Sequence, residues 1–286
     1  MAEQTFETLL YSVDEGIATI TLHRPEKLNA FNRAMIDDLH RVFDMSDGDP
    51  DVGAVIVTGH GRAFCSGMDL TPDNVAPREL APGEIPRDGA GLVTLRIYDS
   101  LKPVIAAANG AGVGVGATMQ CAMDIRLAST QARYGFVFSR RGITLEGCST
   151  WFLPRIVGPS TTLEWCYSGR IFDAKEALER GLVRSIHEPD QLLPAAREIA
   201  RTFIDQNAAV SVALTRQLVY RMMGERHPME AHRYESRSLF SRFSGKDRDE
   251  GVAAFLQKRE ANFPAKVPTD LPDIWDGWDN PSWPGN

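Results

Sequence analysis

A glycine-rich run in the middle of the chain follows a short apolar segment and precedes helix-forming residues. The apolar segment is Pro103–Ala108, the run Asn109–Gly116 has glycine at every second position from Gly110, and the helical residues continue to Met123. Amides at the start of a helix have no partner within the helix, and the helix dipole favours negative charge there. This order of strand, glycine loop and helix predicts a site for an oxyanion or a phosphate.

The glycine run leaves two other interpretations. Gly112–Ala117 also fits the dinucleotide fingerprint GxGxxG/A, but that fold needs an acidic residue at the end of the following strand. Leu127–Thr130 contains none, so dinucleotide binding is disfavoured. Glycines that only let a helix pack closely remain an alternative.

A second loop of small residues, Ala63–Leu70, also follows an apolar segment. Gly67 can turn the backbone so that the amide of Met68 faces a pocket, although a plain connection between two elements is the bland alternative. Two amides from two such loops would form an oxyanion hole, in which each donor contributes about 3 kcal/mol to lowering a barrier.

The remaining pattern predicts an α/β N-terminal part followed by a helical C-terminal part. Asp14-Glu15-Gly16 sits between two strand-like segments and predicts a hairpin, and Asn32 can cap a helix. The stretch Thr71–Gly91 reads as a surface loop that could order over a ligand. The expected strands are Thr8–Val13, Ile17–Leu22, Val52–Thr58, Pro103–Ala108 and Asp124–Ala128, and beyond Phe172 the pattern is mainly helical.

Composition restricts the class of protein. A hydrophobic fraction of 43% and a charged fraction of 24% are ordinary for a folded domain, and the formal net charge of -7 disfavours nucleic acid as the main ligand. No run approaches the roughly 18 apolar residues of a membrane span, and Met1–Leu10 lacks the layout of a signal peptide. We therefore expect a cytoplasmic protein with no membrane partner, reduced cysteines and no metal site.

Three motifs carry a family resemblance: His23–Ala30, the Ala63–Leu70 loop and the Asn109–Gly116 run. In order and spacing they resemble the crotonase superfamily, also called the enoyl-CoA hydratase/isomerase family. The resemblance extends from about Phe6 to Phe263 and leaves out only a tail with Trp275, Trp278 and Trp283, which we expect to pack.

The resemblance implies a spiral core of ββα units at 1–200, a helical C-terminal region used in trimerisation at 201–263, and the tail at 264–286. It implies an acyl-CoA thioester as ligand, no cofactor beyond the CoA of the substrate, and a homotrimer or hexamer. It gives the amides of Met68 and Val115 as the oxyanion hole and Lys258 as a contact to CoA phosphates, with a solvated helix charge as the alternative for Lys258. The other expected substrate or CoA contacts are Lys27, Ala63, Cys65, Gly67, Asp69, Leu70, Gly114, Gly116, Thr118, Phe138 and Trp151.

Carboxylates decide the reaction within such a family. Members that hydrate 2-enoyl-CoA use two glutamates, and this chain has Thr118 and Phe138 at the matching positions, neither of which can act as a base at neutral pH. Glu146-Gly147 instead resembles the segment of Δ3,Δ2-enoyl-CoA isomerases whose glutamate is the single catalytic base. Apolar neighbours such as Phe136, Phe138, Leu145 and Trp151 would raise the pKa of this carboxyl.

Three functions follow from these residues. The leading one is isomerisation of 3-enoyl-CoA to 2-enoyl-CoA through Glu146, the second is an enoyl-CoA hydratase or other lyase, and the third is a catalytically silent subunit that binds a CoA thioester. A helix-capping role is the alternative for Glu146. We expect structural roles for Asp69 and Asp124, in helix caps or loop hydrogen bonds.

Overall fold

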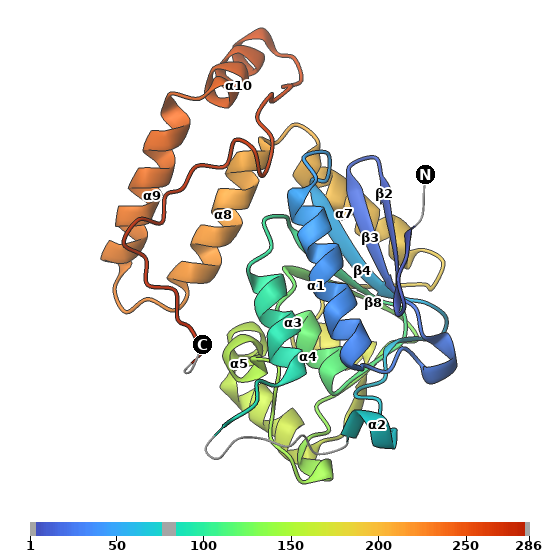
Figure 1. Ribbon diagram of the computed structural model, residues 1–286. Coiled ribbons are helices and arrows are strands. Elements are labelled where there is room, and N and C mark those ends of the chain that lie inside the picture. Colours follow the sequence, from blue (N-terminus) through green and yellow to red (C-terminus); the bar gives the residue numbers. More distant parts are fainter. Residues whose placement is uncertain (1–3, 76–83, 284–286) are drawn as a thin grey trace. The chain divides into compact units, whose positions relative to one another are not determined.

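A computed structural model describes residues 4–75 and 84–283 (Figure 1). The chain divides into two compact units, residues 1–205 and residues 206–286. Part of the Thr71–Gly91 segment, residues 76–83, lies outside the described residues. The flanks of that segment are helical rather than loop, since it contains α2 (Pro72–Val75) and the start of α3 (Gly89–Tyr98).

The first unit contains a sheet of seven strands in the order β1-β2-β3-β4-β6-β8-β11. The predicted hairpin is confirmed, because β2 and β3 pair antiparallel around Glu15 and Gly16, both at positive φ. From β3 to β11 neighbouring strands are parallel. The strands are β1 (Gln4–Thr5), β2 (Leu9–Asp14), β3 (Ile17–Leu22), β4 (Ala54–Gly59), β6 (Val104–Ala108), β8 (Ile125–Ser129) and β11 (Ser185–His187).

A second sheet of four short strands has the order β10-β9-β7-β5. Its strands are β5 (Ala63–Cys65), β7 (Ala111–Val113), β9 (Arg133–Gly135) and β10 (Ile171–Asp173). Along the chain, β4, β6 and β8 enter the large sheet while β5, β7 and β9, which follow them, enter the small one. Helices follow each pair, so the chain winds as repeated ββα units. The sequence did not predict β5 and β7, which it treated as loop, or β11, in the region described as mainly helical.

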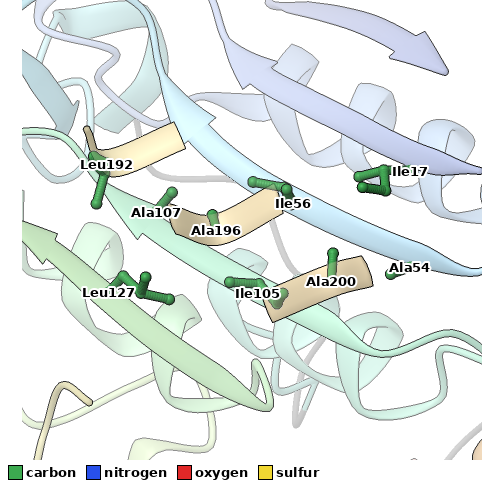
Figure 2. Close-up of a cluster of buried hydrophobic side chains, with 9 residues drawn as sticks. All are labelled: Ile17, Ala54, Ile56, Ile105, Ala107, Leu127, Leu192, Ala196 and Ala200. Atoms are coloured by element: carbon green, nitrogen blue, oxygen red, sulfur yellow. The ribbon is translucent and has the colours of Figure 1, made fainter. Parts of the chain in front are cut away.

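Two helices, α1 (Arg33–Gly48) and α7 (Leu192–Ile204), pack against the large sheet of the first unit. Asn32 caps α1, as predicted, by accepting a hydrogen bond from the amide of Met35 at 3.0 Å. Small and branched side chains of α7 pack on parallel strands, and Figure 2 shows Ala196 beside Ile56 and Ala200 beside Ile105. Elsewhere in this unit, α4 (Val115–Cys121) packs on the small sheet, α5 (Ser149–Ser168) packs on α4, and α6 (Ala174–Glu179) lies against β9, β10 and β11.

The second unit consists of α8 (Ala209–Met222), α9 (Pro228–Phe243), α10 (Lys246–Gln257) and the tail. The expectation that the tail packs is confirmed for Trp275, whose indole N–H donates to Gln217 at 2.8 Å and whose ring stacks on Tyr234 at 5.1 Å between centroids. The guanidinium of Arg221 lies 3.8 Å from the centre of the same ring. Aromatic stacking and cation–π contact therefore fix the tail on this unit.

None of the helices described in either unit combines the length and the apolar character that a membrane crossing requires.

Candidate active site

The two small-residue loops predicted to act together lie side by side. Their strands β5 and β7 are parallel neighbours, with Ala63 opposite Ala111 and Cys65 opposite Gly112. Gly67 and Gly114, which follow these strands, have φ values of 111° and 54°. A Cβ atom added to Gly114 would lie 3.8 Å from the Cα of Gly67. Because glycine adopts positive φ without strain, the backbone can turn at both positions, where the two loops pass close to each other.

Those next amides belong to Met68 and Val115. Bonds on either side hold the Met68 peptide, since the Phe31 amide donates to the Gly67 carbonyl and the Asp69 amide donates to the Phe31 carbonyl, both at 2.8 Å. Val115 is the first residue of α4, where an amide has no partner within the helix. Within the described residues neither amide donates to a backbone carbonyl outside its own element. The oxyanion hole expected from these two N–H groups stays a prediction.

Gly116 sets the distance between α4 and β5. A Cβ atom at this position would lie 2.0 Å from the carbonyl oxygen of Cys65. No side chain fits there unless the backbone moves. The packing interpretation of the glycine run is therefore correct for Gly116.

Two asparagines fix the turn that leads into β5. The fully buried Asn29 side chain donates to the carbonyls of His60 and Ala63, at 2.9 and 2.8 Å. Asn109 donates to the carbonyl of Gly61 at 2.8 Å and accepts from the amide of Gly59 at 3.0 Å. The turn between the two sheets is held by amide side chains from two distant segments, which stabilises the position of the Met68 loop.

Glu146 forms a direct contact with the helix that carries Val115. The Thr118 hydroxyl of α4, which is fully buried, donates to Oε1 of Glu146 at 2.7 Å. Gly147 follows at a φ of 63°, and a Cβ atom there would lie 3.0 Å from the Thr118 hydroxyl oxygen. Glycine at 147 therefore allows the chain to pass close to α4 and present the carboxyl to it.

The pKa of Glu146 rises from its ordinary value to about 7. Burial is the main cause, and the negative charge of Asp88 adds to it, while the hydrogen bond from Thr118 acts in the opposite direction. Desolvation penalises the ionised carboxylate, which confirms the direction predicted from the sequence. A carboxyl with a pKa near neutrality can both accept and return a proton at that pH.

The capping alternative for Glu146 is wrong. Its backbone carbonyl, and not its carboxyl, accepts bonds from the amide of Ser149 at 3.1 Å and from the Ser149 hydroxyl at 2.6 Å. The N-cap residue of α5 is Cys148. The Glu146 side chain bonds instead to Thr118, away from the first turn of α5.

Glu146 also lies near Cys65, at the end of the strand that leads into the Met68 loop. Its charge contributes to the raised pKa of Cys65, which burial lifts to about 12, and acts similarly on Cys121 of α4, also at about 12. Both thiols are fully desolvated and remain protonated at neutral pH. The Glu146 carboxyl therefore lies near both the end of β5 and α4.

The structural roles expected for two aspartates are confirmed. Asp69 is buried and pairs with Arg24 at 2.8 Å, which holds the pKa of Asp69 below its ordinary value. Asp124 accepts a hydrogen bond from the amide of Val104 at 2.7 Å. Neither carboxylate is a candidate base.

The other predicted contacts have varied surroundings. Lys27 and Leu70 are exposed, and Phe138 is buried. Trp151 stands edge-on to Tyr98 at 6.1 Å between centroids. Lys258 lies in the second unit, at the C-cap of α10. In the part of the chain that the structure describes, no group of three or more His, Cys, Asp or Glu side chains is arranged to hold a metal ion.

Sequence analysis missed Asp88. Its carboxylate accepts a hydrogen bond from the amide of Gly147 at 3.2 Å as well as one from the amide of Gly91 at 2.5 Å. An aspartate before the helix start was a readable capping signal. The hydrogen bond from the Gly147 amide joins residues 59 positions apart and was not predictable from that capping pattern.

Comparison with known proteins decides the family. Residues 12–266 match the enoyl-CoA hydratase/isomerase family. The chain belongs to this family. An enoyl-CoA hydratase of Alternaria alternata is 38% identical over 256 residues, covering 87% of this chain and 83% of the relative. A 1,2-epoxyphenylacetyl-CoA isomerase of Escherichia coli (strain K12) is 32% identical over 270 residues, covering 91% and 99%.

The structure agrees with this assignment. The crystal structure of an enoyl-CoA hydratase from Bacillus anthracis aligns with a TM-score of 0.83 at 26% identity and covers 90% of this chain and 99% of that one. The fold is the mixed α/β crotonase fold, as the motifs predicted. The protein is an enoyl-CoA hydratase/isomerase family member that processes acyl-CoA thioesters.

Proposed function

We propose that this protein isomerises 3-enoyl-CoA to 2-enoyl-CoA, with Glu146 as the only base. One observation carries the proposal: the Glu146 carboxyl, with a pKa of about 7, bonds to Thr118 three residues after the Val115 amide. A base and a pair of oxyanion donors therefore occupy one locality. A relative in Escherichia coli (strain K12) is named a 1,2-epoxyphenylacetyl-CoA isomerase, so isomerisation of a CoA thioester has a precedent among similar chains.

The reaction needs only these groups. The amides of Met68 and Val115 bind the thioester oxygen and stabilise the negative charge that develops on it. Ionised Glu146 removes a proton from C2, the electron pair enters the conjugated system, and a dienolate forms. Protonated Glu146 then delivers the proton to C4, the double bond moves to C2–C3, and the thioester carbonyl is restored. No proton or electron is gained or lost overall.

Hydration is the second candidate, because the Alternaria alternata relative is named an enoyl-CoA hydratase. Addition of water to a 2-enoyl thioester needs one group to deprotonate water and a proton source for C2. Thr118 stands at one expected carboxylate position and bonds to Glu146, while Phe138 is a buried hydrocarbon at the other. A single acidic side chain suits proton transfer along the substrate better than hydration.

Two further features belong to the proposal. Lys258 would contact the CoA phosphates, and the protein would assemble as a homotrimer or hexamer. Neutralising the charge in Lys258→Gln should raise KM for the CoA thioester more than it lowers kcat, because the phosphates are remote from the reacting carbons. An unchanged KM would remove Lys258 from the binding site.

A pair of assays separates the candidates. Purified protein is incubated with 3-hexenoyl-CoA and, separately, with crotonyl-CoA, each beside Glu146→Gln. We expect isomerisation of 3-hexenoyl-CoA that disappears in the variant. Rapid hydration of crotonyl-CoA that survives Glu146→Gln would refute the proposal, and acyl-CoA binding without turnover of either substrate would favour the silent binding subunit.

A further inference from the structure

One oxygen of Asp88 joins two segments next to the proposed base. Oδ1 accepts from the amide of Gly91, in the first turn of α3, at 2.5 Å. The same atom accepts from the amide of Gly147, the residue after Glu146, at 3.2 Å. Ordinary helix capping uses only the first of these bonds. The second extends the cap into the segment that carries Glu146.

Glycine at both donor positions makes this geometry accessible. A Cβ atom on Gly91 would lie 2.5 Å from Oδ2 of Asp88, so a larger residue would push the carboxylate away. Gly147 adopts a φ of 63° and lies against Thr118 and Ala90. Its amide is thereby directed at Asp88 while the preceding carboxyl bonds to Thr118. The peptide after Glu146 is held from two sides.

Among the described residues, Asp88 is the charged group that raises the pKa of Glu146, after the larger effect of burial. Cys65 and Cys121 are neutral thiols at physiological pH, because burial raises the pKa of each to about 12. Burial also raises the pKa of Cys148, and Arg87 acts on that thiol in the opposite direction. The described groups acting on or facing Glu146 are Thr118 and Cys121 of α4, Cys65 of β5, Cys148 before α5 and Asp88 before α3.

We propose that Asp88 is a positioning residue, which ties the Glu146-Gly147 segment to the amino end of α3 and places a fixed negative charge beside the Glu146 carboxyl. This inference rests on the proposed function of Glu146 as the base. Repulsion between the two carboxylates makes proton uptake by Glu146 more favourable, which strengthens Glu146 as a base for the C2 proton. The hydrogen bond that Asp88 accepts from the Gly147 amide holds the segment that carries the Glu146 carboxyl in position.

The test compares Asp88→Asn with wild type. The amide of asparagine retains an acceptor oxygen for the two N–H groups but removes the charge. Asp173→Asn is the matched control, because Asp173 caps α6 through the amide of Glu176 at 2.9 Å and is not among the groups acting on Glu146. Protein labelled with ¹³C at the glutamate carboxyl is titrated by NMR, and Glu146 is assigned from the signal missing in Glu146→Gln.

We expect Glu146 of Asp88→Asn to titrate at a lower pH than in wild type, and Asp173→Asn to match wild type. The acid limb of kcat/KM for 3-hexenoyl-CoA should move in the same direction, and its plateau should fall because the base is weaker. An unchanged titration in folded Asp88→Asn would overturn the inference. Asp88→Ser, a favourable cap without charge, gives a second measurement with the same expected shift if the asparagine variant folds poorly.

The NMR readout separates this inference from the proposed function. If wild type turns over no enoyl-CoA, the titration of Glu146 still shows whether Asp88 acts on it. If wild type isomerises its substrate and neither the titration nor the pH profile responds to Asp88→Asn, the function stands and the role of Asp88 falls.

Discussion

Replacing Thr118 by valine removes the hydroxyl that donates to Glu146 and keeps the side-chain shape. This bond stabilises the ionised carboxylate, so its loss must raise the pKa of Glu146 further above its ordinary value. Hydrogen bonds to charged groups contribute about 1.5 to 3 kcal/mol, and about 1.4 kcal/mol changes an ionisation constant tenfold. We take the lower figure, because the neutral carboxyl keeps part of its interactions.

The pH dependence of kcat/KM then has a defined form. With a pKa of about 7, roughly a tenth of wild-type Glu146 is ionised at pH 6. A tenfold weaker acid would lower kcat/KM at pH 6 by about tenfold and leave it within about twofold of wild type above pH 9. Thr118→Ser keeps the hydroxyl and serves as the control. An acid limb of Thr118→Val that stays in place or moves to lower pH would refute the argument.

Three more predictions use other parts of the structure. The raised pKa of Glu146 means that the folded state binds more protons than the unfolded state between pH 4.5 and about 7, so stability falls as pH rises through that window. In urea unfolding, Glu146→Gln should therefore be more stable than wild type at pH 8, by up to about 3 kcal/mol, and equally stable at pH 4. Equal stability at pH 8 would contradict the raised pKa of Glu146. Gly116→Ala should lower kcat by about a hundredfold or more, because its Cβ forces α4 away from Cys65 and misplaces an oxyanion donor. Gly48→Ala is the control, because a Cβ there meets no atom within 4 Å, and it should retain wild-type kcat. Trp275→Ala should destabilise the second unit by about 2 to 4 kcal/mol in thermal or urea unfolding, because it loses its stacking on Tyr234 and its bond to Gln217.

Long elements of the fold were predictable because their burial repeats locally. The strands β3, β4 and β6 consist of β-branched and apolar residues on which α7 packs, and α1 shows apolar residues at helical spacing behind its Asn32 cap. Three-residue strands such as β5 and β7 have no such period. β5 is a strand because it pairs with β7 across 48 positions of sequence, between Ala63 and Ala111, and β7 also pairs with β9.

The candidate site also has features that could be predicted from the sequence and contacts that could not. Glycine loops and Glu146 could be found from local motifs, because backbone turns and acidic side chains are visible in the sequence. Thr118 was noticed as a replaced carboxylate position, but its bond to Glu146 depends on how α4 and α5 pack. Asp88 was assigned to a loop, since no local pattern indicates that a helix cap also holds the amide of Gly147.

The proposed isomerisation depends on proton movement by Glu146. The most direct measurement follows the hydrogens at C2 and C4 of 3-hexenoyl-CoA by NMR in D₂O, with wild type and with Glu146→Gln at equal concentration. We predict that wild type forms 2-hexenoyl-CoA with changes at both carbons, and that both signals of the substrate stay unchanged with the variant. Exchange at C2 by Glu146→Gln at the wild-type rate would contradict it.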